Sequence, residues 1–161
     1  MNLKIVVLCL VFVVNLEAQS SKIADHLYAT GNFTKAVELY KNSKEVETVY
    51  DKIAKSYIAI GKYDNGLEYY KKAIITLPSN DLLKYEYAKL LARTKNFIDA
   101  NTSFRNLIRS DSLNPNYHYE LGVILEKQRD TTNQDQFLKT FDLDETHQKA
   151  IFKIAKHQLI K

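Results

Sequence analysis

The sequence has very little glycine and proline. Its 161 residues include four glycines, two prolines and no tryptophan. A sheet protein built from hairpins needs turn residues at intervals of about 8 to 12 positions, so this scarcity disfavours that class. Long helices joined by a few tight turns are the expected alternative. An apolar fraction of 45% with 26% charged residues fits a folded chain and not a disordered one.

Cysteine is also nearly absent. Cys9 lies within the apolar run of residues 5–14, IVVLCLVFVV. The residues before it, VVL, lack the small side chains of a bacterial lipoprotein cleavage site, so a lipid anchor is not expected. Because no cysteine follows this run, the fold must be stable without disulfides, even in an oxidising compartment.

The beginning of the chain has the three parts of a secretory signal peptide. Lys4 precedes the apolar run, and the polar and small residues NLEAQSS follow it. Ten helical residues rise only about 15 Å, roughly half of a bilayer core, which disfavours a membrane span. We predict a signal peptide over 1–19, cleavage near Ala18 or Gln19, and export to the periplasm or outer envelope of a bacterium. The alternative is an uncleaved anchor.

Positive and negative charges alternate along the chain. The 23 basic and 19 acidic residues give a net charge of +4 without a basic block. This pattern is typical of solvated helix surfaces and does not indicate a nucleic-acid partner.

No pattern indicates an enzyme, a cofactor, a metal site or a small-molecule substrate. The four histidines are scattered, and neither an HExxH motif nor a glycine-rich phosphate loop occurs. The acidic stretches DLDET and RDTTNQDQ lack the glycine and the final glutamate of a calcium loop, and we interpret them as helix caps. His147 and His157 are interpreted as surface or capping residues.

Two segments of the chain share one pattern of glycine, small and aromatic residues. GNFTKAVELY occupies 31–40 and GKYDNGLEYY occupies 61–70. Before each such segment a small residue recurs at intervals of 30, 34, 34 and 33, at Ala24, Ala54, Ala88, Gly122 and Ala155. A period of about 34 with apolar residues at helical spacing predicts stacked pairs of helices, each pair joined by a short turn. The small residue of the first helix lets the aromatic of the second pack closely.

This pattern resembles the tetratricopeptide repeat family. The second repeat matches the family at Tyr50, Ile53, Ala54, Tyr57, Gly61, Tyr63, Gly66, Tyr70, Ala73 and Pro78. The resemblance implies an all-α, right-handed solenoid over 20–161, with about four and a half repeats that start near 17, 47, 81, 115 and 148. It also implies a protein or extended peptide as partner, bound in a concave groove lined by the first helices.

The sequence departs from the family pattern in several places. Lys95 replaces the turn glycine of the third repeat, and Lys84 stands where a large apolar residue is usual. The fourth repeat has no clear small residue in its second half, where a short helix is expected. Only a first helix follows it, which either caps the array or belongs to a longer one.

The groove-facing residues are predicted by counting from the small residues. They are Asp25, Tyr28, Asp51, Lys55, Tyr85, Lys89, Arg93, Tyr119, Glu126 and Phe152. Lys55, Lys89 and Arg93 would form a basic strip suited to an acidic or aromatic peptide, although exposed charges of this kind are also ordinary on helix surfaces. Some family members hold a terminal carboxylate with a lysine and asparagines. Ser21, Asp25 and Lys52 occupy the matching places here, so that clamp is not expected.

The sequence therefore predicts a non-enzymatic, exported scaffold that binds a protein or peptide. The alternative is a periplasmic sensory ectodomain, or the N-terminal repeat segment of a longer signalling or secretion-machinery protein. The total length of the natural chain discriminates between these two hypotheses.

Overall fold

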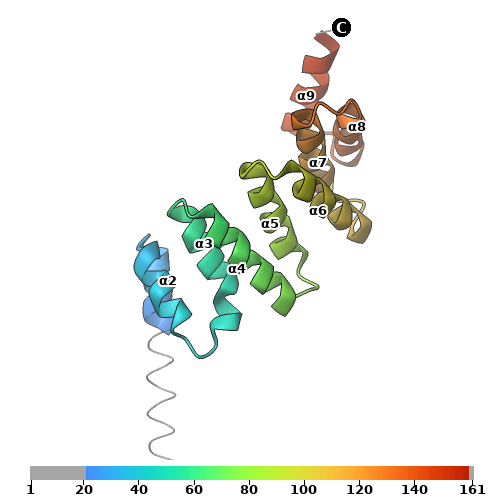
Figure 1. The fold of residues 1–161 in the computed structure, drawn as a ribbon. Helices are drawn as coiled ribbons and strands as arrows, with labels where there is room; N and C mark the ends of the chain where they lie inside the picture. The colour runs from blue at the N-terminus through green and yellow to red at the C-terminus, as the bar shows by residue number, and fades with distance from the viewer. Residues whose placement is uncertain (1–20, 160–161) are drawn as a thin grey trace, which may run out of the picture. The chain divides into compact units, whose positions relative to one another are not determined.

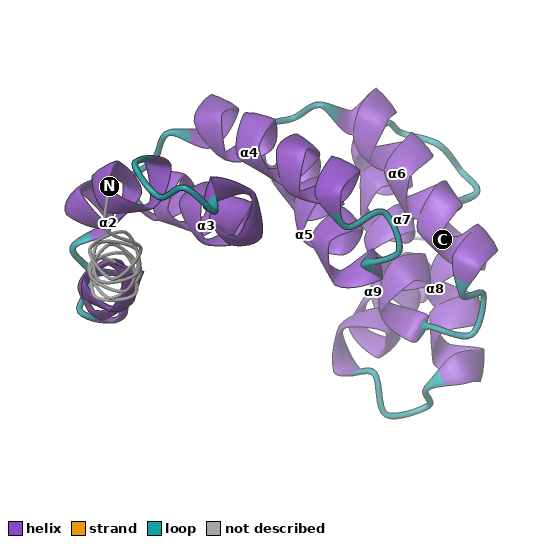
Figure 2. Cartoon of the chain, turned by 90° about the horizontal axis from the view of Figure 1, so that it is seen from below, coloured by secondary structure: helices purple, strands orange, loops and turns teal. Residues whose placement is uncertain are grey.

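The computed structural model describes residues 21–159, and all regular structure in this range is helical (Figures 1 and 2). The all-α prediction is confirmed. The predicted signal peptide, 1–19, lies outside the described residues. None of the described helices is long and apolar enough to cross a membrane. A first helix covers residues 21–29, and the others are α2 (Phe33–Lys41), the 3-10 helix η1 (Val46–Val49), α3 (Tyr50–Ala59), α4 (Tyr63–Thr76), α5 (Asp81–Arg93), α6 (Phe97–Ser110), α7 (Pro115–Lys127), α8 (Asn133–Leu143) and α9 (Gln148–Leu159).

The helices form two compact units. The first unit extends to Pro78, and the second begins at Ser79. In the first unit, α2 packs on α3 and α3 on α4; in the second, α5, α6, α7, α8 and α9 each pack on the next. Helices that are neighbours in sequence are therefore neighbours in space within each unit, as a helical-repeat array requires.

Small residues on the first helices pack against large residues on the second helices. Ala54 and Ala88 are fully buried, as are the aromatic rings of Tyr70 and Phe104. The tightest approach is at Gly122 of α7, where an added Cβ would lie 2.7 Å from Cε1 of Phe137 on α8. Glycine is therefore required at this position by the packing of α8 and not by its backbone conformation.

Four turns between paired helices share one backbone geometry. The residue that ends the turn has a positive φ at Gly31 (80°), Gly61 (77°), Lys95 (64°) and Arg129 (60°). In each turn the next residue donates its amide to the carbonyl five residues back, as Asn96 does to Leu91 at 2.8 Å. These are the bonds of a Schellman motif, which usually has glycine at the left-handed position. The second unit thus keeps the motif with Lys95 and Arg129 in place of glycine, although residues with a Cβ adopt a positive φ less readily.

The fourth pair has a longer turn and a shorter second helix. Helix α4 begins two residues after Gly61, whereas α8 begins four residues after Arg129. The extra loop is held by Asp130, whose Oδ1 accepts bonds from the amide (2.9 Å) and the hydroxyl (2.7 Å) of Thr132. With 11 residues, α8 is shorter than α4 and α6, which have 14 each, as predicted, although α2 has only 9.

The two acidic stretches satisfy free amides, but their Asp and Thr side chains do not act as helix N-caps. Asp144 binds Thr146 through the same two bonds that Asp130 makes to Thr132. Thr132, at the N-cap of α8, makes no side-chain capping bond. At the start of α9, Nδ1 of His147 accepts the amide of Ala150 at 3.2 Å. The capping residue there is the histidine, which agrees with its interpretation from sequence.

Candidate peptide-binding surface

The predicted groove residues are divided between the two units. Asp25 and Tyr28 lie in the helix of residues 21–29, and Asp51 and Lys55 lie in α3, all within the first unit. The second unit holds the rest: Tyr85, Lys89 and Arg93 on α5, Tyr119 and Glu126 on α7, and Phe152 on α9. Of the proposed basic strip, the structure brings Lys89 and Arg93 together, one helical turn apart on α5.

In the first unit, Asp25 links three helices. It accepts the hydroxyl of Tyr40 on α2 and the ammonium of Lys52 on α3, each at 2.6 Å. The bond from Lys52 and then that from Tyr40 hold the pKa of Asp25 below its ordinary value, although burial acts in the opposite direction. Burial, followed by the bond to Asp25, raises the pKa of Tyr40. Asp25 is therefore a structural connection as well as a half-exposed carboxylate.

The other predicted residues of this unit make local contacts. Lys55 pairs with Asp51 one turn earlier on α3, at 3.1 Å, and both side chains remain partly exposed. Such pairs contribute only about 0.3 to 0.5 kcal/mol. The ring of Tyr28 packs edge-on against Phe33 with centroids 5.6 Å apart. Lys52, at one of the places that a carboxylate clamp would use, is engaged by Asp25.

In the second unit, Tyr85 is the centre of an aromatic and charged cluster. Its ring lies 5.9 Å from that of Phe104 and 5.6 Å from that of Tyr117, and the Lys89 ammonium lies 5.1 Å from its centroid. Burial is the main cause that raises the pKa of Tyr85 to about 12, with the charge of Glu120 next.

Glu120 of α7 completes this cluster and was not predicted. Burial raises the pKa of this carboxyl group, while the charges of Lys89 and Lys149 and a hydrogen bond from Tyr85 act against that shift. Lys89 also lies 3.7 Å from Glu86 on its own helix. Glu120 thus joins α7 to α5 through charge and hydrogen bonding.

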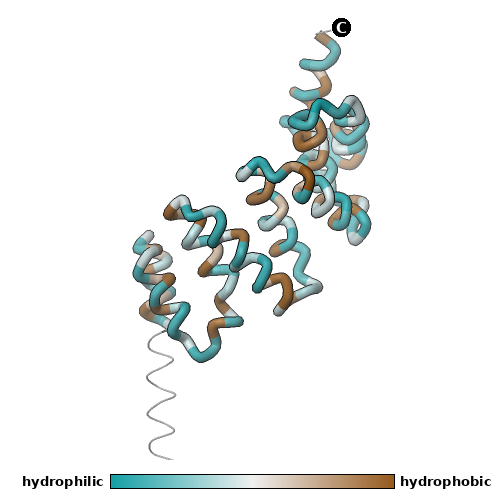
Figure 3. Tube along the Cα trace, viewed as in Figure 1, coloured by the Kyte–Doolittle hydropathy of each residue, from teal (hydrophilic) through white to brown (hydrophobic). Residues whose placement is uncertain are grey.

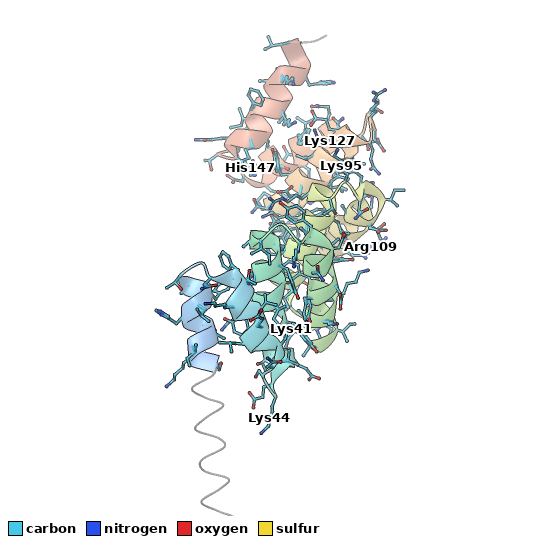
Figure 4. The ribbon with its side chains drawn as sticks, turned by 60° about the vertical axis from the view of Figure 1, so that its left-hand side comes forward. Lys41, Lys44, Lys95, Arg109, Lys127 and His147 are labelled. Carbon is cyan, nitrogen blue, oxygen red and sulfur yellow. The ribbon has the colours of Figure 1, made fainter. Side chains whose placement is uncertain are left out.

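The contact between α7 and α9 follows the same plan. Lys153 of α9 donates to the carboxylate of Glu126 on α7. Beside this pair, the ring of Tyr119 lies 5.8 Å from that of Phe137 and 4.8 Å from that of His147, which Figure 4 labels at the start of α9. Burial, and then the charges of Glu120 and Glu126, raise the pKa of Tyr119.

A sequence signal for these contacts exists. A charged residue stands two positions before the small residue in each repeat after the first, at Lys52, Glu86, Glu120 and Lys153. Three of the four reach the preceding first helix of their own unit: Lys52 reaches Asp25, Glu120 reaches Tyr85 and Lys89, and Lys153 reaches Glu126. We call these contacts the cross-repeat pairs. The charged partners are Asp25, Lys89 and Glu126, whose signs alternate from repeat to repeat. A search for a basic strip therefore overlooks these contacts.

The cross-repeat pairs leave a mixed surface on the second unit. Arg93 is exposed at the end of α5, Phe152 of α9 is 65% exposed, and the Lys89 side chain is partly exposed above the ring of Tyr85. These groups can donate charged hydrogen bonds and stack on apolar side chains. Within residues 21–159, no group of three or more His, Cys, Asp or Glu side chains is placed to hold a metal ion.

Two surface hollows lie in the first unit, and neither is lined by a predicted site residue. One, of about 280 Å³, lies between α2 and the end of α3 and includes Lys41; the other, of about 400 Å³, lies between residues 21–24, the end of α2 and η1, and includes Lys44 (Figure 4). Val37, Tyr57 and Ile60 give the first hollow an apolar floor.

Comparison with known proteins identifies the fold. The sequence matches no protein-family model and no curated protein. MamA matches with a TM-score of 0.73 and 18% identity over 82% of this chain and 80% of that one. MamA from residue 41 onward, from Desulfovibrio magneticus RS-1, gives a TM-score of 0.75 and 15% identity over 86% and 81%. YrrB, described as a TPR protein with an unusual peptide-binding site, gives 0.69 and 14% over 89% and 86%.

The fold is tetratricopeptide-like. At these identities the likeness concerns the arrangement of the helices.

Proposed function

We propose that this chain is a non-enzymatic tetratricopeptide-like scaffold that binds an extended peptide or protein segment along the exposed faces of its first helices. The fold supports this proposal, because helical-repeat proteins present their first helices as a ligand surface. The description of YrrB as a peptide-binding TPR protein is consistent with it.

One observation carries the proposal: the cross-repeat pairs. Glu120 and Lys153 tie α5, α7 and α9 to one another, and Lys89 and Arg93 of α5 and Phe152 of α9 remain exposed on these joined helices. A ligand surface held in place before binding loses less conformational entropy when the ligand arrives. The pairs therefore provide a rigid base on which the exposed groups can act.

The exposed groups select for acidic and aromatic peptide side chains. Lys89 and Arg93 offer charge-assisted hydrogen bonds to carboxylates, and the planar guanidinium can bind a carboxylate through two bonds. Phe152 provides an exposed ring for apolar or aromatic side chains. Aromatic and arginine side chains are the residue types that contribute most energy to protein interfaces.

Peptide binding tests this proposal directly. Short fluorescein-labelled peptides of acidic-aromatic, basic-aromatic and uncharged polar composition would be titrated with the protein and followed by fluorescence anisotropy. We expect the acidic-aromatic peptides to bind best, and the double change Lys89→Glu and Arg93→Glu to weaken them by about tenfold or more. Lys139→Glu, an exposed charge reversal on α8, is the matched control.

Two results would contradict the assignment. Equal affinity of the double variant and the parent would place the site elsewhere, and equal affinity for all three peptide classes would remove the stated selectivity. Circular dichroism of each variant confirms that helicity is kept, since both replaced side chains on α5 are exposed.

We also propose that the protein acts outside the bacterial cytoplasm, in the periplasm or outer envelope. The order of Lys4, the apolar run 5–14 and the small residues after it supports export. N-terminal sequencing of the protein from fractionated bacterial cells tests this. We expect a mature chain that begins near Ala18 or Gln19; an intact N-terminus in the cytosolic fraction would refute export.

A further inference from the structure

The helices α8 and α9 expose apolar side chains at positions where the rest of the molecule is polar or buried. Among the described residues, the exposed large apolar side chains of this hairpin are Leu138 (47%) and Phe141 (36%) on α8, with Ile151 (41%), Phe152 (65%) and Leu159 (88%) on α9. Apolar side chains that gather on one element mark an interaction surface more often than scattered ones do.

The outer face of α8 differs from its counterparts. In α2 and α4 the sixth and ninth residues are glutamate and lysine, at Glu38 and Lys41 and at Glu68 and Lys71. In α6 the same places hold Thr102 and Arg105. In α8 they hold Leu138 and Phe141. At these two places the other described second helices carry charged or polar residues, whereas α8 carries two large apolar ones.

Among the described residues, none covers one face of α9. Its packing onto the body of the unit uses Ala150, which is fully buried, and Lys153. Ile151, Ala155 and Leu159 are four residues apart and form an apolar stripe that stays exposed, and Phe152 borders it. In Figures 1 and 3, α9 extends away from α7 and α8 with hydrophobic residues recurring along it.

The preceding pair shows what would cover such a face. Ile151 and Ala155 stand 33 residues after His118 and Gly122, which are buried on α7 beneath α8. The exposed stripe of α9 is therefore the kind of surface on which a second helix packs. The covering helix needs an apolar face flanked by acidic residues, because α9 carries Lys149, Lys153 and Lys156 and no acidic residue.

The outer face of α8 has this composition. Asp135 and Asp142 are exposed and lie one turn before and one turn after Leu138. An acidic and apolar face on α8 thus complements a basic and apolar face on α9. Because the two faces belong to neighbouring helices of one hairpin, two copies can satisfy both contacts at once around a two-fold axis.

We propose that a second copy of this chain covers the open face of α9, with α8 of each copy packed on α9 of its partner. The contact closes on itself, so it gives a dimer and no filament. The proposal shares Phe152 of α9 with the proposed peptide surface, but the charged groups of that surface, Lys89 and Arg93, lie on α5, so different variants test the two proposals.

The first test is the oligomeric state of the full chain, measured by light scattering and sedimentation velocity from micromolar to millimolar concentration. We expect a dimer that Leu138→Asp and Leu159→Asp each weaken by about tenfold or more. Ile98→Asp, on α6, is the matched control because Ile98 is 77% exposed. All three sites are exposed, so the helicity should be unchanged.

The second test exchanges charges between copies. Lys156→Glu places a negative charge opposite Asp142 at both contacts, and Asp142→Lys places a positive charge opposite Lys156 at both contacts, so each variant alone should be monomeric. When the two are mixed, both contacts regain opposite charges, and a heterodimer should form. Recovery on mixing also shows that neither variant has lost its fold.

Three outcomes would overturn the proposal. A parent chain that remains monomeric at millimolar concentration leaves α9 uncovered or covered by something other than a second copy. A dimer that both leucine variants leave intact uses another surface. Assembly that continues beyond a dimer excludes the two-fold arrangement. Peptide affinity is measured on the same samples, so that failure of the dimer is not confused with failure of the peptide site.

Discussion

The left-handed turn residues show how a sequence can depart from a motif while the backbone keeps it. Lys95 and Arg129 adopt φ of 64° and 60°, in the region that Gly31 and Gly61 occupy in the first unit. For a residue with a Cβ, this conformation costs about 1 to 2 kcal/mol. The Schellman hydrogen bonds hold the two residues in this conformation nevertheless. They end the first helix of the pair, and the packing of the second helix depends on the direction in which the chain leaves this turn.

Replacing Lys95 by glycine should stabilise the protein. The relief of backbone strain exceeds the larger freedom of glycine in the unfolded chain, and we expect a net gain of about 0.5 to 1 kcal/mol. Urea denaturation followed by circular dichroism measures it. Lys95→Ala, which also removes the charge but keeps the Cβ, should give no such gain; equal gains from both variants would mean that the lysine charge, and not strain, is responsible.

Two carboxyl groups should influence stability with opposite signs. The pKa of Asp25 is lowered from 3.8, so its contribution to stability is present above that value and is lost as pH falls through the folded-state pKa. The pKa of Glu120 is raised from 4.5, so its ionised form opposes folding above the folded-state pKa, and this opposition is lost on acidification.

At neutral pH, therefore, Asp25→Asn should lower the midpoint of urea denaturation and Glu120→Gln should raise it. Both differences from the parent should shrink when the pH is lowered to about 3, and that of Asp25 should shrink less, because its folded-state pKa lies below the ordinary value. Measurement at the two pH values checks the sign of each. A lower midpoint for Glu120→Gln at neutral pH would show that its bond to Tyr85 outweighs the cost of burial.

At the scale of helices, much of the fold follows from the sequence because the small residues recur. The positions of Ala54, Ala88 and Gly122 identify the first helices, and the aromatic residues that pack against them identify the second helices. The longer turn before α8 does not follow from this pattern, since it depends on the local bonds of Asp130 to Thr132.

The contacts of the candidate site could be predicted from the sequence less completely than the fold. Counting from the small residues places Asp25 and Glu126 on the first helices, but their partners Lys52 and Lys153 come from the next repeat. Such contacts depend on how repeats stack and not on the period within one helix. Glu120 was missed for the same reason, because its environment is formed by α5 as well as by its own helix.

The ion pair of Lys153 with Glu126 should hold α9 on the unit. We expect Lys153→Ala to speed amide hydrogen exchange in α9, with a local loss of about 1 kcal/mol or less because the pair is partly exposed. Hydrogen exchange measured by mass spectrometry resolves this helix from α7. Lys156→Ala serves as the control; faster exchange in both variants alike would assign the effect to charge in general and not to the pair.

At the scale of the whole molecule, the repeat pattern predicts one continuous array, and the structure has two compact units with the boundary after Pro78. The period gives no signal of this boundary, because Pro78 stands where the repeat pattern itself has a proline. Leu77, Pro78 and Ser79 are all exposed at this point.

Limited digestion with proteinase K should cut first in this exposed segment. Exposed chain between compact units is the usual site of proteolytic cleavage, and each unit has its own buried core. Mass spectrometry of the early products checks the position, and circular dichroism of the separated fragments should show that both stay helical. First cleavage within the loop between Arg129 and Asn133 would instead identify α8 and α9 as the least stable part.

The alternating signs of the cross-repeat pairs also affect how the chain finds its order while folding. Lys153 meets the acidic Glu126 of α7, whereas the matching position of α5, four residues after Ala88, holds Ala92. A first helix that skipped a neighbour would therefore lose this ion pair. Repeats with similar apolar surfaces can pack on the wrong neighbour. The charged residue near each small residue disfavours such mispairing, because it finds its partner only on the helix that precedes it in the array.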